Sequence, residues 1–228
     1  VSYYEHNLKE RGDQILARIE AGESCALCSD AGMPAVSDPG ELIVKDAHAR
    51  GIRVVPVPAA SAAVTALCVS GQVTGRWVFE GFLPTNRRQK KERLDALQNE
   101  ERTVIFYEAP HKLTTTLEDL EKAFGPDRSL TICRELTKLH EEVRVTTVEQ
   151  ANAYYRENPP RGEFVLVMAG AAPKVPEEMT LEDAVDFALQ KMEEGMSATA
   201  AAKAAAAASP FSKSEIYKAC IEKGGEHE

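Results

Sequence analysis

The sequence lacks any apolar run long enough to cross a membrane, and no signal peptide is visible in it. It also lacks an excess of positive charge, because 27 Lys and Arg stand against 36 Asp and Glu, giving a net charge of −9. That balance excludes a protein that binds nucleic acid by bulk charge, so any such contact must come from a local patch. What remains is a chain of 228 residues, 43% hydrophobic, which predicts a soluble protein with room for two modest domains.

Cysteine is scarce as well, and the five residues form no regular framework. This usage is typical of a reducing compartment, so we expect a cytoplasmic protein. Cys25 and Cys28 have the C-x-x-C spacing of a metal site, but they lie in a strand-like run in which positions three apart face opposite ways. No second Cys or His pair completes a site. We therefore predict that both thiols pack in a core and that no metal is bound.

The first third of the chain alternates between helix-like and strand-like patterns. Helices are expected where apolar residues recur every three or four positions, and strands where short β-prone runs are bounded by Gly or Pro. The predicted order is helix 9–21, strand 25–28, helix 41–50, strand 52–58 and helix 59–69. Such alternation favours a parallel sheet with crossover helices.

A second α/β unit, richer in strands and mixed in direction, is predicted after a boundary near residues 72–76. Its expected strands are 77–82, 103–107, 129–134, 142–146 and 163–168, and its expected helices are 85–99, 110–124 and 149–157. A linker with Pro173 and Pro176 then leads to three short helical patterns at 181–194, 197–208 and 212–222. The predicted domains are 1–73, 74–172 and 173–228.

The stretch from Ser29 to Gly40, SDAGMPAVSDPG, joins a predicted strand to a predicted helix. A strand, a small-residue loop and a helix form the unit with which α/β proteins hold a ligand at a strand's carboxyl end. Gly32 lets the backbone turn where a Cβ would obstruct it, and Pro34 stiffens the loop. An ordinary strand-to-helix turn capped by Asp38 or Ser37 explains the same pattern equally well.

Four further stretches are candidates for chemistry. The run 107–112 places polar groups at a strand end just before a helix, and its His111 fits either a general base or, more often, an exposed structural residue. Ser61 lies at a predicted helix start, where free amides can hold a ligand, although from spacing alone a simple N-cap explains it. The run 134–142 crowds acids and bases together, which fits either an ion-pair network or a substrate-facing loop. The run 87–93 holds five positive charges, for which a solvated helix face is the default and a phosphate-binding patch the alternative.

Taken in order, these motifs resemble one family. They read SDAGMPAVSDPG, VPVPAASAAVTAL, GFLP, IFYEAPHK, RELTKLHEE and RGEFVLVMAG. The chain is similar to the ribosomal RNA small-subunit methyltransferase I family of the tetrapyrrole methylase superfamily, roughly over residues 4–170. Its helical tail is similar to that family's small C-terminal domain. RELTK and EAPH point to the family, whereas the first loop alone marks the superfamily.

The resemblance implies an enzyme that uses S-adenosylmethionine to methylate the 2′-hydroxyl of a cytidine in small-subunit (16S) ribosomal RNA. It implies an α/β, class III methyltransferase fold with the cofactor between two domains, and a homodimer that acts on ribosomal RNA or the 30S subunit, away from membranes. The implied cofactor-binding residues are Ser29, Asp30, Ala31, Gly32, Met33, Pro34, Ser61, Ala62, Tyr107, Glu108, Ala109, Pro110, Ala169 and Gly170.

A ribose hydroxyl is a weak acid, so a base or cation that favours its alkoxide should assist transfer. We predict this role for Glu135, Lys138 and Glu141 in the charged run. The residues predicted to contact RNA are Arg87, Arg88, Lys90, Lys91 and Arg134.

Three departures from the family pattern stand out. Ala59 and Ala60 replace a usual Gly-Pro, Lys112 replaces a usual Arg, and the family's first strand with its Pro-Ile-Gly-Asn-like turn is not seen. We therefore expect a truncated first domain and a chain that, as given, holds the cofactor weakly or is inactive alone. Two alternatives stay open: a C-methyltransferase for a tetrapyrrole of the precorrin or uroporphyrinogen type, and a non-catalytic module that binds cofactor or RNA.

Overall fold

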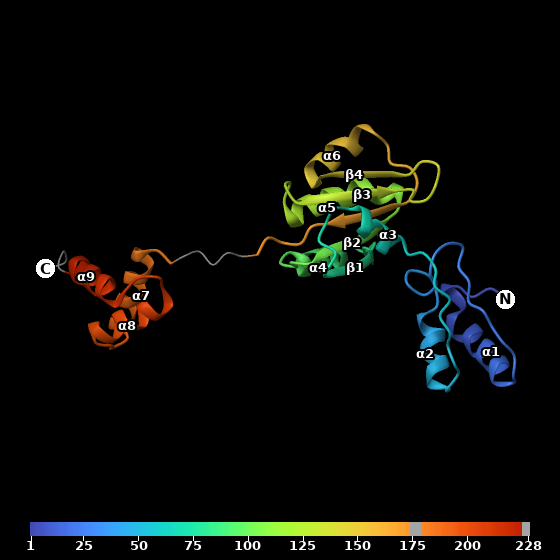
Figure 1. Ribbon diagram of the computed structural model, residues 1–228, viewed down its shortest axis with the longest axis horizontal. Coiled ribbons are helices and arrows are strands. Elements are labelled where there is room, and N and C mark those ends of the chain that lie inside the picture. The colour runs from blue at the N-terminus through green and yellow to red at the C-terminus, as the bar shows by residue number, and fades with distance from the viewer. Residues whose placement is uncertain (174–178, 225–228) are drawn as a thin grey trace. The chain divides into compact units, whose positions relative to one another are not determined.

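A computed structural model describes residues 1–173 and 179–224 of the chain (Figure 1). The chain divides into two compact units, Val1–Ala172 and Pro173–Glu228, each with its own hydrophobic core. The predicted linker residue Pro176 lies outside the described residues. A further division of the first unit between residues 73 and 74 stays a prediction.

The first unit begins with two helices that pack against each other. They are α1 (Leu8–Glu20) and α2 (Glu41–Ala49), preceded by a short 3₁₀ turn at Glu5–Asn7. Arg50, just after α2, reaches back to form ion pairs with Asp13 and Glu20 of α1. Both helices confirm the prediction to within one residue at each end.

The two strands predicted at 25–28 and 52–58 are wrong. Among the described residues, none between Val1 and Arg76 belongs to a strand. A strand needs hydrogen bonds to a neighbouring strand, and β-prone composition alone supplies no partner. Val55 and Val57 therefore stay exposed. Cys25 and Cys28 are exposed free thiols too, so their predicted place in a core is also wrong.

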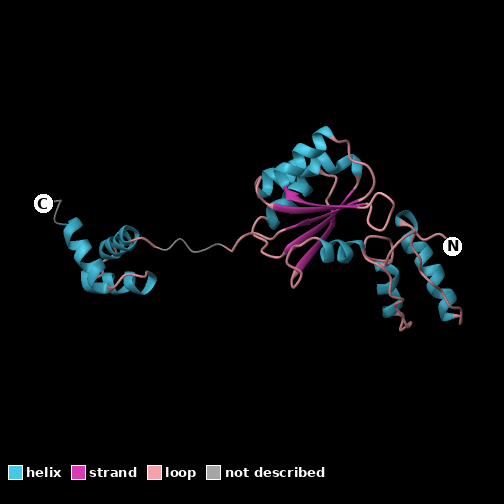
Figure 2. Cartoon of the chain, turned by 45° about the horizontal axis from the view of Figure 1, so that its top comes forward, coloured by secondary structure: helices cyan, strands magenta, loops and turns pink. Residues whose placement is uncertain are grey.

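A twisted sheet of five strands forms the centre of the first unit (Figure 2). Its strands are β1 (Trp77–Phe82), β2 (Thr103–Glu108), β3 (Ser129–Arg134), β4 (Glu142–Thr147) and β5 (Phe164–Met168). Their order across the sheet is β1-β2-β5-β3-β4. β1 and β2 are parallel, whereas β5 is antiparallel to both of its neighbours, and β4 is antiparallel to β3. The predicted mixture of strand directions is confirmed.

Helices cover the two faces of this sheet unequally. One face carries α4 (Arg87–Leu97), α5 (Pro110–Phe124) and α6 (Val148–Glu157), and the other carries α3 (Ala62–Val69). Alternate residues of β2 show the division, because Val104 and Phe106 belong to the first core and Ile105 to the second. Since both sides of the central strands are buried, their sequences read as nearly continuous apolar runs.

Strand direction brings several strand ends to one edge of the sheet. Phe82 pairs with Tyr107, and Phe164 pairs with both Glu108 and Arg134. The carboxyl ends of β1, β2 and β3 therefore lie beside the amino end of β5, and we call this the carboxyl edge. Because open α/β sheets bind ligands outside the carboxyl ends of their strands, the carboxyl edge is where the fold positions a site.

Within its described residues, the second unit consists of three short helices, α7 (Leu181–Glu193), α8 (Ala198–Ala208) and α9 (Lys213–Gly224). The alanines of α8 are small enough for close packing, and Ala201, Ala202 and Ala205 are buried. As predicted, Ser197 and Ser212 cap α8 and α9 by accepting backbone N–H groups. No helix in the described residues is long and apolar enough to cross a membrane.

Glu108, the last residue of β2, is buried although its side chain is ionisable, with 4% of the residue exposed. One carboxylate oxygen accepts the Ala109 amide at 2.8 Å, where α5 begins. The other accepts the Thr116 hydroxyl of α5 at 2.5 Å. Because a buried carboxylate without partners is costly, these two bonds fix the turn from β2 into α5.

We predict that Thr116→Val destabilises the protein by about 1–3 kcal/mol, because it leaves a buried Glu108 oxygen without its donor. Thr115→Val is the matched control, since Thr115 is exposed on the same helix. Urea unfolding of the two variants measures the difference. Equal stability would mean that the bond from Thr116 contributes nothing.

Candidate active site

Residues 29–40, which we call the Ser29 loop, dock on the segment that leads into α3. The Met33 amide donates to the Ala60 carbonyl at 2.9 Å. Gly32 lies beside the same carbonyl with a φ of 73°, and a Cβ there would approach the Ala60 oxygen to 3.1 Å. Glycine suits both the left-handed backbone and the close approach. Two stretches predicted to line the cofactor, 29–34 and Ser61 with Ala62, are therefore adjacent.

The start of α3 is held by a side chain from the sheet. Ser61 occupies the N-cap position, but its side chain makes no capping hydrogen bond within the described part of the chain. Instead, the Ala63 amide donates to the hydroxyl oxygen of Tyr107 at 3.0 Å. Tyr107 is the penultimate residue of β2, at the carboxyl edge. The hydroxyl of Ser61 is thus available to a ligand, whereas the amide of Ala63 is already used.

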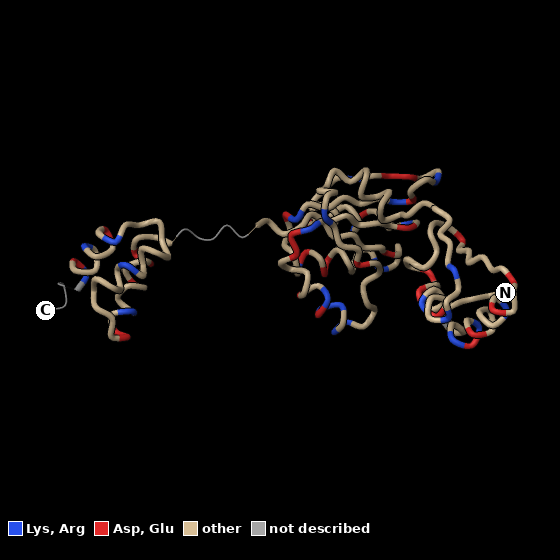
Figure 3. Tube along the Cα trace, turned by 60° about the horizontal axis from the view of Figure 1, so that its bottom comes forward, with Lys and Arg blue, Asp and Glu red and all other residues tan. Residues whose placement is uncertain are grey.

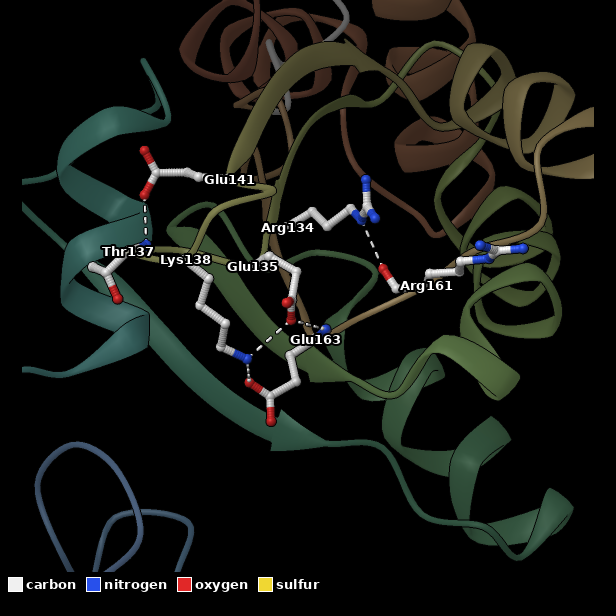
Figure 4. Close-up of polar contacts among 7 residues, drawn as sticks. All are labelled: Arg134, Glu135, Thr137, Lys138, Glu141, Arg161 and Glu163. Carbon is white, nitrogen blue, oxygen red and sulfur yellow. Dashed lines mark hydrogen bonds and ion pairs between the residues drawn. The ribbon is translucent and has the colours of Figure 1, made fainter.

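Residues 134–141, which we call the charged loop, leave β3 at the carboxyl edge. Figure 4 shows Lys138 reaching two carboxylates: its Nζ lies 3.0 Å from Glu135 Oε1 and 2.8 Å from Glu163 Oε2. Glu135 Oε1 also accepts the Glu163 amide at 2.9 Å. The Lys138 side chain remains 48% exposed, so the network holds its amine in place without burying it.

Glu163 is a member of this network that the charged run 134–142 does not predict. Glu163 directly precedes β5, 25 residues beyond Lys138. Its place follows from register, because the first residue of β5 pairs with Arg134 and sets Glu163 beside the charged loop. The sequence shows an acidic residue at the start of a strand, but it does not show which strand will lie next to it.

Two groups of the network, Glu135 and Lys138, keep their charges near neutral pH. The pKa of Glu135 is lowered, first because its carboxylate accepts the Glu163 amide and then because it accepts Lys138. The pKa of Lys138 is raised by its hydrogen bonds to Glu163 and Glu135. Glu135 stabilises the fold until the pH falls through its lowered pKa, and Lys138 does so until the pH rises through its raised pKa. Between those limits Lys138 is a cation and Glu135 is not a free base.

The backbone of the charged loop is strained where it shapes this network. Glu135 and Thr137 have positive φ values, of 49° and 66°. The Thr137 amide donates to a Glu141 carboxylate oxygen at 2.6 Å, so Glu141 serves the shape of the loop (Figure 4). Gly162 faces Glu135, and a Cβ there would overlap with the Glu135 side chain. Such strain persists where the surrounding contacts hold it, as they do at functional sites.

The Arg134 side chain contacts the residues around the end of β3. Its Nε donates to the Arg161 carbonyl at 2.7 Å, and its Nη1 lies 3.8 Å from Glu142, its partner in the β3–β4 ladder. The guanidinium thus links the end of β3 to the segment before β5 (Figure 4). A contact between Arg134 and RNA stays a prediction.

The structure separates Ala169 and Gly170 from the other residues predicted to bind cofactor. Both follow β5, whose last residue, Met168, pairs near the starts of β2 and β3. They therefore lie at the edge of the sheet opposite to Tyr107. The prediction that they close the same site is wrong, because β5 runs antiparallel and its carboxyl end points away.

Glu108 also departs from its predicted role. It follows Tyr107 on β2, so the two side chains point to opposite faces of the sheet. The Glu108 carboxylate is buried against α5, whereas Tyr107 faces α3. Ala109 and Pro110 do begin α5 at the carboxyl edge, as the prediction requires.

The cations of the run 87–93, which include all those predicted to contact RNA except Arg134, lie on α4 and follow one another closely (Figure 3). Most form ion pairs: Arg88 with Glu92, Lys91 with Asp95, Lys90 with Asp119 and Arg93 with Glu80. Among the described residues, no ion pair involves Arg87. The side chains of Arg88 and Lys91 are 87% and 76% exposed, and such pairs contribute about 0–1 kcal/mol, so they open readily for another partner.

A groove of about 1040 Å³ runs between α4 and α5. Five cations line it, and three acids oppose them: Arg87, Arg88, Lys90, Lys91 and Lys122 against Asp95, Glu118 and Asp119. The groove is therefore locally positive in a chain of net charge −9. This is the local patch that binding of a polyanion would need.

Solved structures share this chain's fold over more than two thirds of its length. The methyltransferase CobJ aligns with a TM-score of 0.55 and 20% identity, over 72% of this chain and 71% of CobJ. Uroporphyrin-III C-methyl transferase from Thermus thermophilus, complexed with S-adenyl homocysteine, aligns with a TM-score of 0.51 and 14% identity, over 73% of this chain and 75% of that protein. These identities show the fold alone, which this chain shares with both of these methyltransferases.

The sequence comparisons are more specific. The family model of the Tetrapyrrole (Corrin/Porphyrin) Methylases matches residues 2–152. Ribosomal RNA small subunit methyltransferase I of Synechocystis sp. is 42% identical over 97% of this chain and 80% of the relative. The protein of that name from Bacillus subtilis is 41% identical over 96% of this chain and 76% of the relative. The chain belongs to the ribosomal RNA small subunit methyltransferase I family, which confirms the family predicted from the motifs.

We predict that Tyr107→Phe speeds hydrogen exchange of the Ala63 amide and lowers stability by about 1 kcal/mol. The variant keeps the ring and removes only the oxygen that accepts this amide. Tyr154→Phe is the control, because no hydrogen bond of the Tyr154 hydroxyl occurs among the described residues. Exchange at Ala63 that is the same in both variants would show that α3 does not depend on Tyr107.

Proposed function

We propose that this protein transfers a methyl group from S-adenosylmethionine to the 2′-hydroxyl of a cytidine in the 16S RNA of the small ribosomal subunit. The observation that carries the proposal is the 42% identity, over 97% of this chain, to a relative named ribosomal RNA small subunit methyltransferase I. The carboxyl edge supports it, because the Ser29 loop, the start of α3 with its Ser61 hydroxyl not used as a cap, and the fixed amine of Lys138 all lie there.

The residues at the start of α3 fit the proposed cofactor. Gly32 presents no side chain next to Ala60, and the Ser61 hydroxyl is not used as a cap. We assign cofactor binding to residues 29–34, to Ser61 with Ala62, and to the β2–α5 junction from Tyr107 to Pro110 without the Glu108 carboxylate. When bound, S-adenosylmethionine supplies an electrophilic methyl carbon. The task left to the protein is to place and activate the ribose oxygen.

Lys138 is the residue best suited to activate that oxygen. Its raised pKa keeps the amine cationic at neutral pH, and the side chain is half exposed. A fixed positive charge stabilises the negative charge that develops as the hydroxyl loses its proton to solvent water. Glu135 and Glu163 hold this amine, and Glu141 shapes its loop, so we assign them positioning roles. This narrows the predicted catalytic set to Lys138.

The groove between α4 and α5 is the proposed contact for the RNA backbone. Arg87 is unpaired among the described residues, and Arg88 and Lys91 hold only exposed partners. Phosphate groups can replace these partners at little cost, because exposed ion pairs are weak. Lys90 differs, since its side chain is 16% exposed and bonded to Asp119 at 2.9 Å. We therefore assign phosphate contact to Arg87, Arg88 and Lys91, with Lys90 holding α4 to α5.

We also propose that the protein is a cytoplasmic homodimer. β4 is an edge strand, and it exposes Val143 and Val145 on the face that α3 covers elsewhere. Exposed apolar surface on a sheet edge is a place for a second copy to pack. Sedimentation analysis distinguishes a dimer from a monomer.

The direct test of the proposed function uses 30S subunits and isotopically labelled S-adenosylmethionine. After digestion of the RNA, mass spectrometry should find the label in 2′-O-methylcytidine. A tetrapyrrole precursor serves as the competing acceptor, because the fold is shared with tetrapyrrole methyltransferases. Label on the tetrapyrrole and none on RNA would contradict the proposal.

We predict that Lys138→Ala lowers the rate of methyl transfer by about a hundredfold or more, because it removes a charge that stabilises the transition state. Glu141→Ala should lower it less, since Glu141 acts through the loop. The melting temperature should change little, because the Lys138 side chain is 48% exposed and its partner Glu163 is 82% exposed.

The control for this prediction is Lys45→Ala, which removes an exposed lysine of α2. Transfer is measured per folded molecule. A large loss of stability in Lys138→Ala, with transfer per folded molecule intact, would assign Lys138 to a structural network instead.

We predict that changing Arg87, Arg88 and Lys91 together to Glu weakens binding to 30S subunits and flattens its dependence on salt, because fewer counterions are released. The control changes Lys9, Arg18 and Lys45 to Glu, which alters net charge equally at exposed positions outside α4. Binding is measured over a range of salt concentrations. The same affinity and salt slope in both variants would mean that α4 is an ordinary solvated helix face that does not contact RNA.

A further inference from the structure

β1 contains a bulge that decides where its last aromatic side chain points. Phe79 pairs with Ile105 and Gly81 with Phe106, so Glu80 is an extra residue without a partner on β2. Gly81 has a φ of 61°, in the left-handed region that residues with a side chain rarely adopt. The extra residue shifts the alternation of β1 by one position. Phe79 and Phe82 therefore share a face of the sheet although they are three residues apart.

Both rings pack edge-on against Tyr107. The ring of Phe79 lies 4.9 Å from that of Tyr107, and the ring of Phe82 lies 5.6 Å from it, measured between centroids. Phe79 is partly buried in the core beneath α3, whereas Phe82 is 55% exposed. Among the phenylalanines of the described residues, Phe82 alone is exposed. Its ring is thus held by Tyr107 at the carboxyl edge and is open to solvent.

The displaced residue, Glu80, anchors the bulge to α4. The Glu80 side chain is 3% exposed and forms an ion pair with Arg93. The first cation of α4, Arg87, follows Phe82 by five residues, and Asn86 between them caps the helix by accepting two backbone amides. The exposed ring of Phe82, at the end of β1, and the exposed cations of α4 therefore lie on consecutive elements of the chain.

We propose that Phe82 is a stacking platform for an unpaired nucleobase of the RNA substrate. This inference rests on the proposed function, and it adds a base-binding subsite to the phosphate contacts on α4. Proteins hold single-stranded RNA by stacking its bases on aromatic side chains while cations contact its phosphates. A phenyl ring has no hydrogen-bonding group, so Phe82 adds affinity without selecting a base. The bulge and Tyr107 fix the ring in advance, which lowers the cost of ordering it on binding.

The test compares Phe82→Leu, which keeps an apolar side chain, with Phe82→Trp, which keeps an aromatic one. Stacking on one base predicts that Phe82→Leu binds 30S subunits at least about fivefold more weakly. Phe82→Trp should bind them as tightly as the unchanged chain. The affinity for S-adenosylhomocysteine, the salt slope of RNA binding and the melting temperature should stay the same in both variants.

A spectroscopic readout follows from the single tryptophan of the chain. In a Trp77→Phe background, Phe82→Trp carries tryptophan only at the proposed subsite. A single-stranded oligoribonucleotide should quench its fluorescence by stacking, and S-adenosylhomocysteine should not. Quenching by S-adenosylhomocysteine alone would overturn the proposal and make Phe82 a cofactor contact.

Two other outcomes separate this inference from the proposed function. If the unchanged chain binds and methylates 30S subunits but Phe82→Leu binds them equally well, the subsite is wrong and the proposed function stands. If the unchanged chain neither binds nor methylates the subunits, while a tetrapyrrole accepts the methyl group, the proposed function is wrong and the subsite is wrong with it.

Discussion

The hydrogen bond from the Ala63 amide to the Tyr107 hydroxyl is the contact on which the arrangement of the site depends. It fixes the start of α3 to the carboxyl edge. The same bond helps to position the Ser29 loop, because the Met33 amide of this loop donates to the carbonyl of Ala60, just before α3. On its other side the Tyr107 ring packs against Phe82, next to the segment that leads into α4. One side chain thus joins the residues proposed to bind the cofactor to those proposed to contact RNA.

The direction of β5 supplies the second constraint. Because β5 is antiparallel to β2 and β3, its amino end lies at the carboxyl edge and places Glu163 beside Lys138. The same direction carries Ala169 and Gly170 to the opposite edge. Lys138 of the charged loop therefore contacts one carboxylate from its own loop, Glu135, and one from the segment before β5, Glu163. The strained backbone at Glu135 is held by Lys138 and by the amide of Glu163.

Local signals predicted the helices and the strands of the sheet well, because caps and periodicity are properties of neighbouring residues. The helix 110–124, for example, begins at a proline and is stopped by Gly125. Strand partners are not local, so the β-prone runs at 25–28 and 52–58 were misassigned, and Ala169 and Gly170 were placed at the wrong edge. The bulge at Glu80 likewise depends on the pairing of β1 with β2, so the exposure of Phe82 could not be predicted from the sequence.

The central claim is that the Ser29 loop, the start of α3 and Tyr107 hold the cofactor together at the carboxyl edge. Titration of the isotopically labelled chain with S-adenosylhomocysteine, followed by NMR of the backbone amides, tests it most directly. The predicted result is that the largest shifts fall on residues 29–34, Ser61, Ala62 and Tyr107. Shifts centred on Ala169 and Gly170, at the opposite edge of the sheet, would contradict it.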